Sequence, residues 1–575
     1  MIRKRFGTLF ILLFFLAVLT GGVIYDDLSA SNGDDPYRAI KLLNEAIHQV
    51  SDKYVDPIPS DSLYMRALEG MLMSLDPYSQ LLSPTEYNDL RIHTQGNYEG
   101  LGIRIDIVDN ILTVISPIEG TPAYRAGLRA GDRIVGVDGG TTEGWSEEKA
   151  VLELRGPEGS TVTLTISREG LDEPFEAQIT RQAIKLSAVP YAFMLNDGIG
   201  YVRFTQFSEN GRDELREAIR DLEREGMRAL VLDVRQNPGG LLDQAIEVSD
   251  LFLPKGVEIV ATQGRVADSD RTYSARDNDD FSVHPMVLLI DNGSASASEI
   301  LAGALQDHDR ALIVGETSWG KGLVQSLFSL DDGYFLKLTT ARYYTPSGRS
   351  IQRENGIDLD QFAGLGEVQA APSEAGVLNG EALETIPDSL VFNTDMGRTV
   401  YGGGGVMPDV VVKAEKLSEL STQLLEQAFR KNAFFSFAVH YHGTHPTLAR
   451  TFAPDQALLE EFRTYLSREK EIDFSDEAFD AEAEYIRDFL RYTLISQYHG
   501  EGVARQAVME ADLPLAKAVD LLTEADTLAD LFRMAERERH ADAGPETETA
   551  AAEDSAGGPG PILIDQSLLD QPTPR

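Results

Sequence analysis

The chain has 575 residues, of which 93 are acidic and 51 are basic, so its formal net charge at pH 7 is −42. A chain of this length predicts several domains, and its negative charge argues against nucleic-acid or anionic-membrane binding by its body, since both need basic surfaces. The sequence contains no cysteine, which excludes disulfides, thiolate chemistry and cysteine-ligated zinc.

The first 27 residues predict a segment that directs export. Arg3, Lys4 and Arg5 precede an apolar run from about Leu9 to Ile24, and two aspartates follow the run. Basic residues before such a run and acidic residues after it place the amino end in the cytoplasm and the rest outside. The run fits an uncleaved membrane anchor or a cleaved signal, and both alternatives stay open.

The next part of the chain predicts a helical region followed by a strand-rich domain. Residues 36–95 carry apolar residues such as Ile40, Leu43 and Ile47 at helical spacing. In residues 96–183, short alternating strands are separated by turns, which is typical of one small strand-rich domain.

The remainder predicts an α/β core and a helical extension. Residues 184–352 alternate strands with helices, which favours a largely parallel sheet. Residues 353–400 are rich in Gly, Ala, Glu and Asn and indicate a surface insertion, after which residues 401–415 complete the core. Amphipathic helices are expected in residues 416–540, and the acidic, Pro- and Gly-rich residues 541–575 are expected to be disordered.

The stretch GETSWGKGL, residues 315–323, has most of the pattern of a nucleotide-binding loop. Its glycine and lysine spacing fits G-x-x-x-x-G-K-[ST], but Gly322 stands where the pattern requires a hydroxyl residue. A phosphate loop also needs a helix after its lysine, whereas residues 323–330 alternate like an extended strand. The sequence therefore argues against nucleotide binding by Lys321.

A serine upstream offers Lys321 a different role. Ser296 lies where a predicted buried strand turns into a predicted helix. A serine hydroxyl is a weak nucleophile until a base removes its proton, and a lysine can be that base when burial lowers its pKa toward neutrality. A drop of about three pKa units costs about 4 kcal/mol, and Trp319 and Leu323 are the apolar neighbours expected to bury the amine.

These residues also have structural interpretations. Ser296 and Glu299 fit S-x-x-E, the pattern of a helix capping box, and Lys321 between two glycines could be an exposed turn residue. The turn at 238–240 could simply end a strand. A Ser-His-Asp hydrolase, lacking G-x-S-x-G, would need a distant histidine such as His308.

Residues 293–325 read GSASASEILAGALQDHDRALIVGETSWGKGLVQ. They resemble the catalytic segment of the C-terminal processing peptidases, or tail-specific proteases, a family of serine endopeptidases with a Ser-Lys dyad. The resemblance implies that Ser296 is the nucleophile and Lys321 the general base. It also implies that Gln325 orients the lysine and that Asp307 is a supporting residue.

A second segment, LDVRQNPGGLL at residues 232–242, is similar to the glycine turn that follows a core strand in this family. The resemblance implies that the backbone amides of Gly240 and Ala297 form the oxyanion hole. Two amides aimed at a developing oxyanion stabilise it by several kcal/mol.

The strand-rich domain is similar to the PDZ domain of the same family, most specifically in SPIEGTPAYRAGLRAGDRIVGVDG at residues 116–139. The resemblance implies that the backbone amides of one loop bind the C-terminal carboxylate of a substrate. The residues of this loop are Gly100, Leu101, Gly102 and Ile103. The resemblance also makes Arg155 a possible sensor of the docked peptide. Residues 54–84 resemble a helical region that is used in dimerisation.

These similarities cover about residues 36–415. They imply a crotonase/ClpP-like α/β protease core with an inserted strand-rich PDZ domain, a helical N-terminal region and a helical C-terminal extension. The implied activity is that of an exported, ATP-independent serine endopeptidase that binds apolar C-terminal tails of proteins and cleaves them. A catalytically inert PDZ scaffold or holdase is the alternative.

The same resemblance sets the expected partners. Neither a cofactor nor a metal is expected, because the lysine would supply the proton-abstracting group. Protein substrates and a homodimer through the N-terminal helices are expected, without nucleic acid. Only residues 1–27 are expected to reach the membrane, with the body in the cell envelope at the periplasmic face of the inner membrane.

Overall fold

The computed structural model describes residues 36–195, 198–276, 281, 284–353, 376–378, 381–383, 387–413 and 418–542. Contacts divide the chain into two units, one comprising residues up to Ser83 with Leu327–Thr339, and the other the rest. Among the helices in these ranges, none is long and apolar enough to cross a bilayer. The predicted segment 1–27, the tail beyond residue 542 and much of the predicted insertion lie outside the described residues.

The first unit begins with the two helices that the periodicity predicted. They are α2 (Pro36–Lys53) and α3 (Ser60–Met73), and β1 (Gln80–Leu82) then pairs antiparallel with the start of β18 (Phe335–Tyr344). Ile47 is buried as expected. Many apolar side chains of these two helices nevertheless remain exposed on this single chain: Ile40, Leu43, Val50, Leu68 and Met71, as does Leu75 just after α3.

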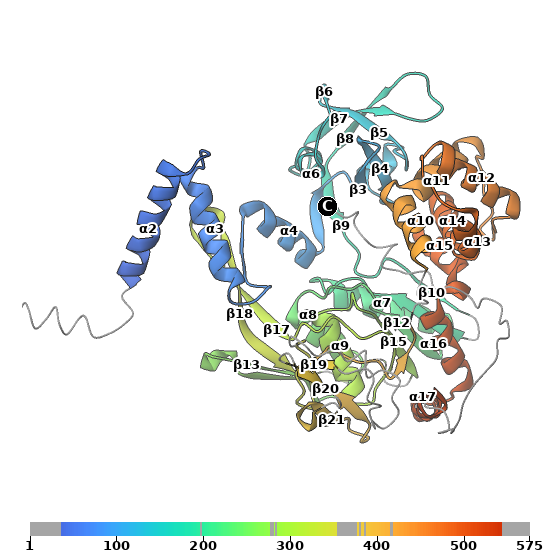
Figure 1. Cartoon of the computed structure of the whole chain (residues 1–575). Coiled ribbons are helices and arrows are strands. Elements are labelled where there is room, and N and C mark those ends of the chain that lie inside the picture. Colours follow the sequence, from blue (N-terminus) through green and yellow to red (C-terminus); the bar gives the residue numbers. More distant parts are fainter. Residues whose placement is uncertain are drawn as a thin grey trace, which may run out of the picture. The chain divides into compact units, whose positions relative to one another are not determined.

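A six-stranded sheet in the order β10-β11-β12-β15-β16-β23 lies in the second unit (Figure 1). Its strands are β10 (Ala192–Met194), β11 (Ile199–Arg203), β12 (Ala229–Asp233), β15 (Met286–Ile290), β16 (Leu312–Gly315) and β23 (Val410–Val411). All neighbouring strands run parallel except β10 and β11. The parallel sheet predicted from the alternation of strands and helices is therefore present.

Helices cover both faces of this sheet. They are α7 (Gly211–Arg224), α8 (Leu242–Asp250) and α9 (Ala297–Asp307) on one face, and α16 (Leu513–Glu524) and α17 (Leu528–Asp542) on the other. Successive residues of a strand point to opposite faces, so Leu230 and Leu232 pack with the first group and Val231 with the second. The end of the C-terminal extension is thus one layer of the α/β core.

The strand-rich domain has its own core. Its sheet has the order β3-β4-β5-β7-β8, with β6 beside β5. The strands are β3 (Ile103–Val108), β4 (Ile111–Pro117), β5 (Arg133–Val137), β6 (Gly140–Thr141), β7 (Thr161–Ser167) and β8 (Phe175–Thr180). Helices α5 (Pro122–Arg125) and α6 (Glu147–Leu154) accompany them, and β2 (Asn97–Gly100) pairs with β9 (Gln182–Lys185). Strand β3 is an edge strand.

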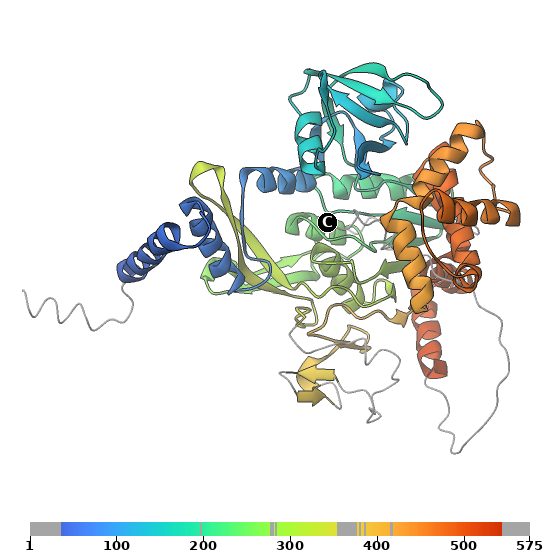
Figure 2. The same ribbon diagram turned by 45° about the horizontal axis from the view of Figure 1, so that its top comes forward.

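A third sheet has five strands, which are β1, β13 (Glu258–Gly264), β14 (Arg271–Ser274), β17 (Leu323–Ser329) and β18. Strands β17 and β18 form a long hairpin, drawn in yellow-green in Figure 2. Helix α4 (Pro84–Gln95) precedes the strand-rich domain, and short strands β19 (Gly376–Leu378), β20 (Glu381–Leu383), β21 (Val391–Asn393) and β22 (Thr399–Tyr401) follow the hairpin.

The helices between residues 419 and 507 form a bundle with an aromatic core, in which Phe434, Phe437, Phe462 and Phe489 are buried. They are α10 (Glu419–Arg430), α11 (Ala433–Thr444), α12 (Gln456–Arg468), α13 (Asp476–Ala481), α14 (Ala483–His499) and α15 (Glu501–Ala507). The amphipathic helices predicted for the extension are therefore present.

Candidate active site

Ser296 occupies the corner between strand β15 and helix α9, immediately before the helix begins at Ala297. Its backbone has φ 55° and ψ −110°, a combination that is unfavourable for a residue with a side chain. Strained backbone of this kind persists only where the surroundings hold it, and it concentrates at functional sites. The strain and the partial burial of Ser296 therefore single out this corner.

The buried carboxylate of Glu299 holds both this corner and the lysine segment. It accepts hydrogen bonds from the amides of Ser296, Gly320 and Lys321 at 2.8, 2.6 and 2.9 Å, and from the Ser318 hydroxyl at 2.6 Å. Complete burial raises the pKa of Glu299, although the four hydrogen bonds oppose that rise. Glu299 thus does more than close the capping box with Ser296, because its carboxylate also accepts from the amides of Gly320 and Lys321.

Tyr343 joins the same two segments on their carbonyl side. Its hydroxyl lies 3.1 Å from the carbonyl oxygen of Ser296 and 2.5 Å from that of Lys321. The side chain is 1% exposed, and it belongs to strand β18. The backbones of Ser296 and Lys321 are therefore connected through a carboxylate at their amides and a hydroxyl at their carbonyls.

Lys321 and Gly322 precede strand β17, and Lys321 Nζ donates to Oε1 of Gln325 at 3.1 Å. Because a strand and not a helix follows the lysine, the segment lacks the helix N-terminus of a phosphate loop, in agreement with the argument from sequence. Lys321 is partly buried. Trp319, expected to help bury the amine, is itself 52% exposed.

The glycine turn at 238–240 lies against the Ser296 corner. A Cβ on Gly239 would meet Ala297 N at 2.8 Å and Ser296 Cβ at 3.0 Å. Gly240 pairs with Phe207, and a Cβ there would meet the Phe207 carbonyl oxygen at 2.3 Å. Close backbone approach thus requires glycine at both positions.

The two amides assigned to the oxyanion hole are those of Gly240 and Ala297. Within the described part of the chain, the N–H groups of Gly240 and Ala297 donate to no acceptor. Ala297 is the first residue of α9, where amides have no partner inside the helix. Asn237 fixes the turn beside them, since its carbonyl accepts from Ala295 N at 3.0 Å and from Ser298 Oγ at 2.8 Å.

Asp307 lies at the opposite end of α9 from Ser296. Its carboxylate pairs with the buried guanidinium of Arg349 at 2.8 Å and accepts from Ser347 N at 3.0 Å. These contacts tie α9 to the segment after β18, and they put Asp307 outside the immediate surroundings of Ser296.

The geometry disfavours a histidine base. His308 follows α9, about 18 Å from Ser296 at a rise of 1.5 Å per residue. Its Nδ1 lies 2.7 Å from the carboxylate of Asp395 and its Nε2 lies 2.6 Å from the carbonyl oxygen of Glu258. Both ring nitrogens are thus engaged far from the serine.

The loop from Gly100 to Ile103 connects β2 to the edge strand β3. Gly102 has φ +78°, and a Cβ on it would meet the Thr121 side chain at 2.3 Å. The carbonyls of Leu101 and Gly102 accept from Ala123 N and Ile118 N at 3.0 and 2.9 Å. These bonds fix the loop beside a strand edge to which a peptide strand can add.

Arg155, the possible sensor, follows helix α6. Its Nη1 donates to Asp89 of α4 at 2.7 Å, and its guanidinium lies over the ring of Tyr98 at 5.5 Å. The structure therefore gives Arg155 two partners at the base of the strand-rich domain.

Comparison with known proteins now identifies the chain. Residues 198–361 match the family model of Peptidase family S41, and residues 89–167 match that of the PDZ domain. A carboxy-terminal-processing protease of Bartonella bacilliformis is 44% identical over 335 residues, which cover 57% of this chain and 76% of the relative. The chain belongs to peptidase family S41. The predicted family is confirmed, and this S41 peptidase is a serine-type peptidase with a PDZ domain.

Other relatives of this S41 peptidase carry similar names. A carboxyl-terminal-processing protease of Synechocystis is 40% identical, covering 52% of this chain and 72% of the relative. Among solved structures, a photosystem II D1 C-terminal processing protease is 32% identical, with a TM-score of 0.32, covering 54% of this chain and 90% of that one.

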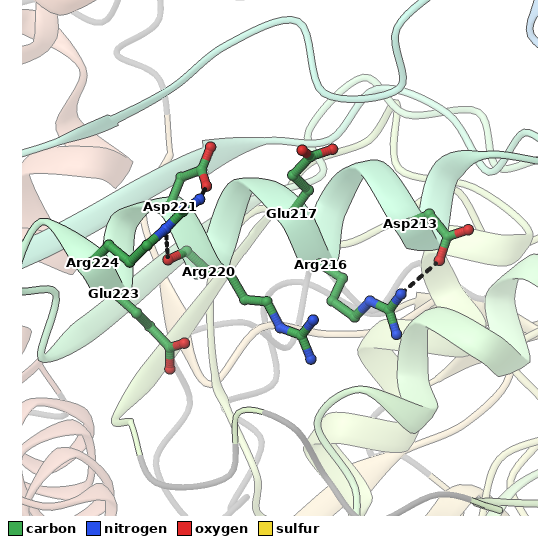
Figure 3. Close-up of a pocket in the computed structure, with 7 residues that line it drawn as sticks. All are labelled: Asp213, Arg216, Glu217, Arg220, Asp221, Glu223 and Arg224. Atoms are coloured by element: carbon green, nitrogen blue, oxygen red, sulfur yellow. Dashed lines mark hydrogen bonds and ion pairs between the residues drawn. The ribbon is translucent and has the colours of Figure 1, made fainter.

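A hollow elsewhere on the S41 peptidase does not belong to this site. Figure 3 shows that it is lined by acidic and basic side chains of the single helix α7. Asp213 pairs with Arg216 at 3.4 Å, and Asp221 pairs with Arg224. The hollow is a helix face on which acidic and basic side chains pair with one another. Within the residues described, no cluster of His, Asp and Glu could hold a metal ion.

Sequence reasoning missed two residues of the site in this S41 peptidase. The S-x-x-E pattern marked Glu299, but only as a cap, and nothing in it indicated the contact with the amide of Lys321. Tyr343 lies in ARYYTPSGRSIQ, a segment that the resemblance covered without pointing to its hydroxyl.

Proposed function

We propose that this S41 peptidase is an ATP-independent C-terminal processing endopeptidase in which Ser296 is the nucleophile and Lys321 the general base. The observation that carries the proposal is the shared support of the two residues. Glu299 Oε2 accepts from both amides, so the two amide nitrogens can be no further apart than the sum of those two distances. A hydroxyl and an amine anchored in this way can form a nucleophile–base pair.

In the proposed reaction, the neutral amine of Lys321 removes the proton of Ser296 Oγ as the oxygen attacks the scissile carbonyl. Gln325 Oε1 accepts a hydrogen bond from Nζ, and its proposed role is to orient the amine so that the nitrogen lone pair faces the serine. The amides of Gly240 and Ala297 stabilise the oxyanion. The ammonium then gives its proton to the leaving amine, and water activated by the regenerated amine hydrolyses the acyl-enzyme.

The PDZ domain is proposed to select substrates by their C-terminal tails. The loop from Gly100 to Ile103 would bind the terminal carboxylate through backbone amides, and the tail would extend edge strand β3. Arg155 would report occupancy through its contacts with Asp89 and Tyr98.

Export, dimerisation and the type of core are proposed as well. The apolar run in residues 1–27 supports export to the cell envelope, with the body at the periplasmic face of the inner membrane. The exposed apolar side chains of α2 and α3 support a homodimer through these helices, because large exposed apolar surfaces mark interfaces. The parallel sheet between helical layers supports a crotonase/ClpP-like core.

The test compares wild type, Ser296→Ala, Lys321→Ala and His308→Ala on a folded protein that ends in an apolar tail. Cleavage is expected to disappear in the first two variants and to persist in His308→Ala. Lys337→Ala is a matched control, since Lys337 is a half-buried lysine of the hairpin that follows Lys321, and burial lowers its pKa. Cleavage by either dyad variant would reject the dyad, and absence of cleavage by wild type would favour the inert scaffold.

A further inference from the structure

A buried ion cluster joins the C-terminal extension to the end of strand β12. Arg235, 4% exposed, donates to the carboxylate of Asp512 through Nη1 and Nη2, at 2.8 Å each. The same guanidinium donates to Asp233 through Nε at 3.0 Å and through Nη2 at 2.6 Å. Asp233 also accepts from Arg203 at 3.0 Å and from the Tyr201 hydroxyl at 2.7 Å.

The two arginines and two aspartates of this cluster balance one another. Burial by itself would raise the pKa of Asp233, but the charges of Arg235 and Arg203 outweigh it and hold that pKa below its usual range. Burial would lower the pKa of Arg235, but Asp233 and Asp512 raise it well above its usual value. A buried charge that loses its partner is strongly destabilising, so the cluster depends on Asp512.

The position of Asp512 is fixed by the helix that it begins. Its carboxylate caps α16 by accepting from Leu515 N at 3.1 Å. Leu515 and Leu521 of that helix are buried against Val231 and Leu289 of the central sheet. The apolar contact therefore holds the carboxylate at a set place relative to strand β12.

Arg235 leads directly into the turn that carries Gly240. The next residue, Gln236, has φ 52°, and both its amide and its side-chain nitrogen donate to Asp291 at 2.8 Å. Asn237 then binds the Ser296 corner through Ala295. A displacement of Arg235 is thus passed to the turn at 236–240 through a short stretch of backbone that is bonded to the corner.

We propose that Asp512 is a positioning residue for the reaction: by fixing the guanidinium of Arg235, it holds the 236–240 turn where the Gly240 amide can bind the oxyanion. This inference rests on the proposed roles of Ser296 and Gly240. It makes the C-terminal extension a part of the catalytic unit, although the match to the S41 family model ends at residue 361.

The test uses Asp512→Asn, which removes the charge, and Asp512→Ser, which keeps a helix-capping oxygen but cannot reach Arg235 in the same way. Asp455 is the matched control, since it caps α12 of the same extension by accepting from Leu458 N at 2.9 Å. Asp455→Asn and Asp455→Ser make the same changes at a helix cap that has no contact with Arg235. All variants are assayed well below their melting temperatures in the full chain.

For both Asp512 variants, kcat is expected to fall about 10- to 100-fold, with KM unchanged. This fall is smaller than the one caused by removing an oxyanion donor completely. Affinity for a peptide boronic acid, which forms a tetrahedral adduct on the serine, is expected to fall in parallel. The Asp455 variants are expected to keep wild-type kcat even if they melt earlier. In an Arg235→Lys background, Asp512→Asn is expected to add little, because the two residues act as one unit.

Unchanged kcat in a folded Asp512 variant, or an increase in KM alone, would overturn the inference. If neither variant folds, Asp512→Glu, which keeps the charge but displaces the carboxylate, is measured in the same way and must show the same fall. Ser296→Ala separates the two proposals. Activity that survives in Ser296→Ala rejects the proposed function, whereas a dead Ser296→Ala beside a fully active Asp512→Asn rejects only the role of Asp512.

Discussion

The amide nitrogens of Ser296 and Lys321 donate to the same oxygen atom, Oε2 of Glu299, at 2.8 and 2.9 Å. The other oxygen of that carboxylate accepts from Gly320 N and the Ser318 hydroxyl. One buried side chain thus sets the position of both partners of the proposed dyad. It fixes their backbones without itself taking part in proton transfer.

Replacing this carboxylate should disable the site. Glu299→Gln turns an NH₂ group toward one pair of donors, and each buried amide left unpaired costs about 1–3 kcal/mol. We expect a lower melting temperature and a fall in kcat of about 100-fold, the order expected when a reacting group is misplaced by about 1 Å. Glu482→Gln in the helical bundle, where Glu482 is 4% exposed, controls for the loss of a buried carboxylate. Wild-type kcat in Glu299→Gln would contradict this role.

Gln325, the hydrogen-bond partner of the Lys321 amine, should influence how activity depends on pH. Gln325→Glu puts a carboxylate 3.1 Å from Nζ, in place of the amide oxygen. A nearby negative charge favours the ammonium form of a lysine, so the rising limb of activity against pH is expected to move to higher pH. Gln325→Leu removes the hydrogen bond without adding charge, and it should lower kcat while leaving the limb near its wild-type position. Identical pH profiles of activity for Gln325→Glu and wild type would show that the side chain at position 325 does not contact the amine of Lys321 during the reaction.

Binding of substrate tails should depend on Gly102. Gly102→Ala forces a Cβ to 2.3 Å from Thr121 at φ +78°, so the loop must move. We expect at least about 10-fold weaker binding of a peptide with an apolar C-terminus, a loss of about 1.4 kcal/mol, measured by fluorescence polarisation. Gly139→Ala is the matched control, because its φ is +80° but its Cβ would meet nothing within 4 Å. Equal affinities in the two variants would argue against carboxylate binding at this loop.

The ion cluster at Asp233 should contribute to acid unfolding. The pKa of Asp233 is lower in the folded chain than its usual 3.8, so its stabilisation is present above that value and is lost as the pH falls through the folded pKa. Asp233→Asn should therefore be less stable than wild type at neutral pH. Below about pH 4 its free energy of unfolding should fall less steeply than that of wild type, and the two slopes should differ by up to about 1.4 kcal/mol per pH unit. Asp243→Asn, at the exposed start of α8, is the control, with denaturant unfolding measured from pH 2 to 6. If the unfolding free energy of Asp233→Asn fell with pH as steeply as that of wild type, this contribution would be excluded.

Local patterns in the sequence predicted much of the fold. Alternation and buried apolar runs predicted the strands that became β11, β12, β15 and β16, and the extended pattern after Lys321 predicted β17. Helical spacing predicted α2 and α3, but not that their apolar stripe stays exposed on one chain. Periodicity reports the face that a helix presents, and it does not report what covers that face.

The sequence by itself determined the residue types of the site, because a strand-to-helix corner, glycines and a lysine before a strand are local features. Tertiary structure alone decided which distant groups support them. Tyr343 reaches across 47 residues to Ser296, and Asp512 reaches across 277 residues to Arg235. Such pairs leave no local signal, since buried charges and hydroxyls find partners by the packing of whole layers, and that packing is set by the entire core and not by any one stretch of chain.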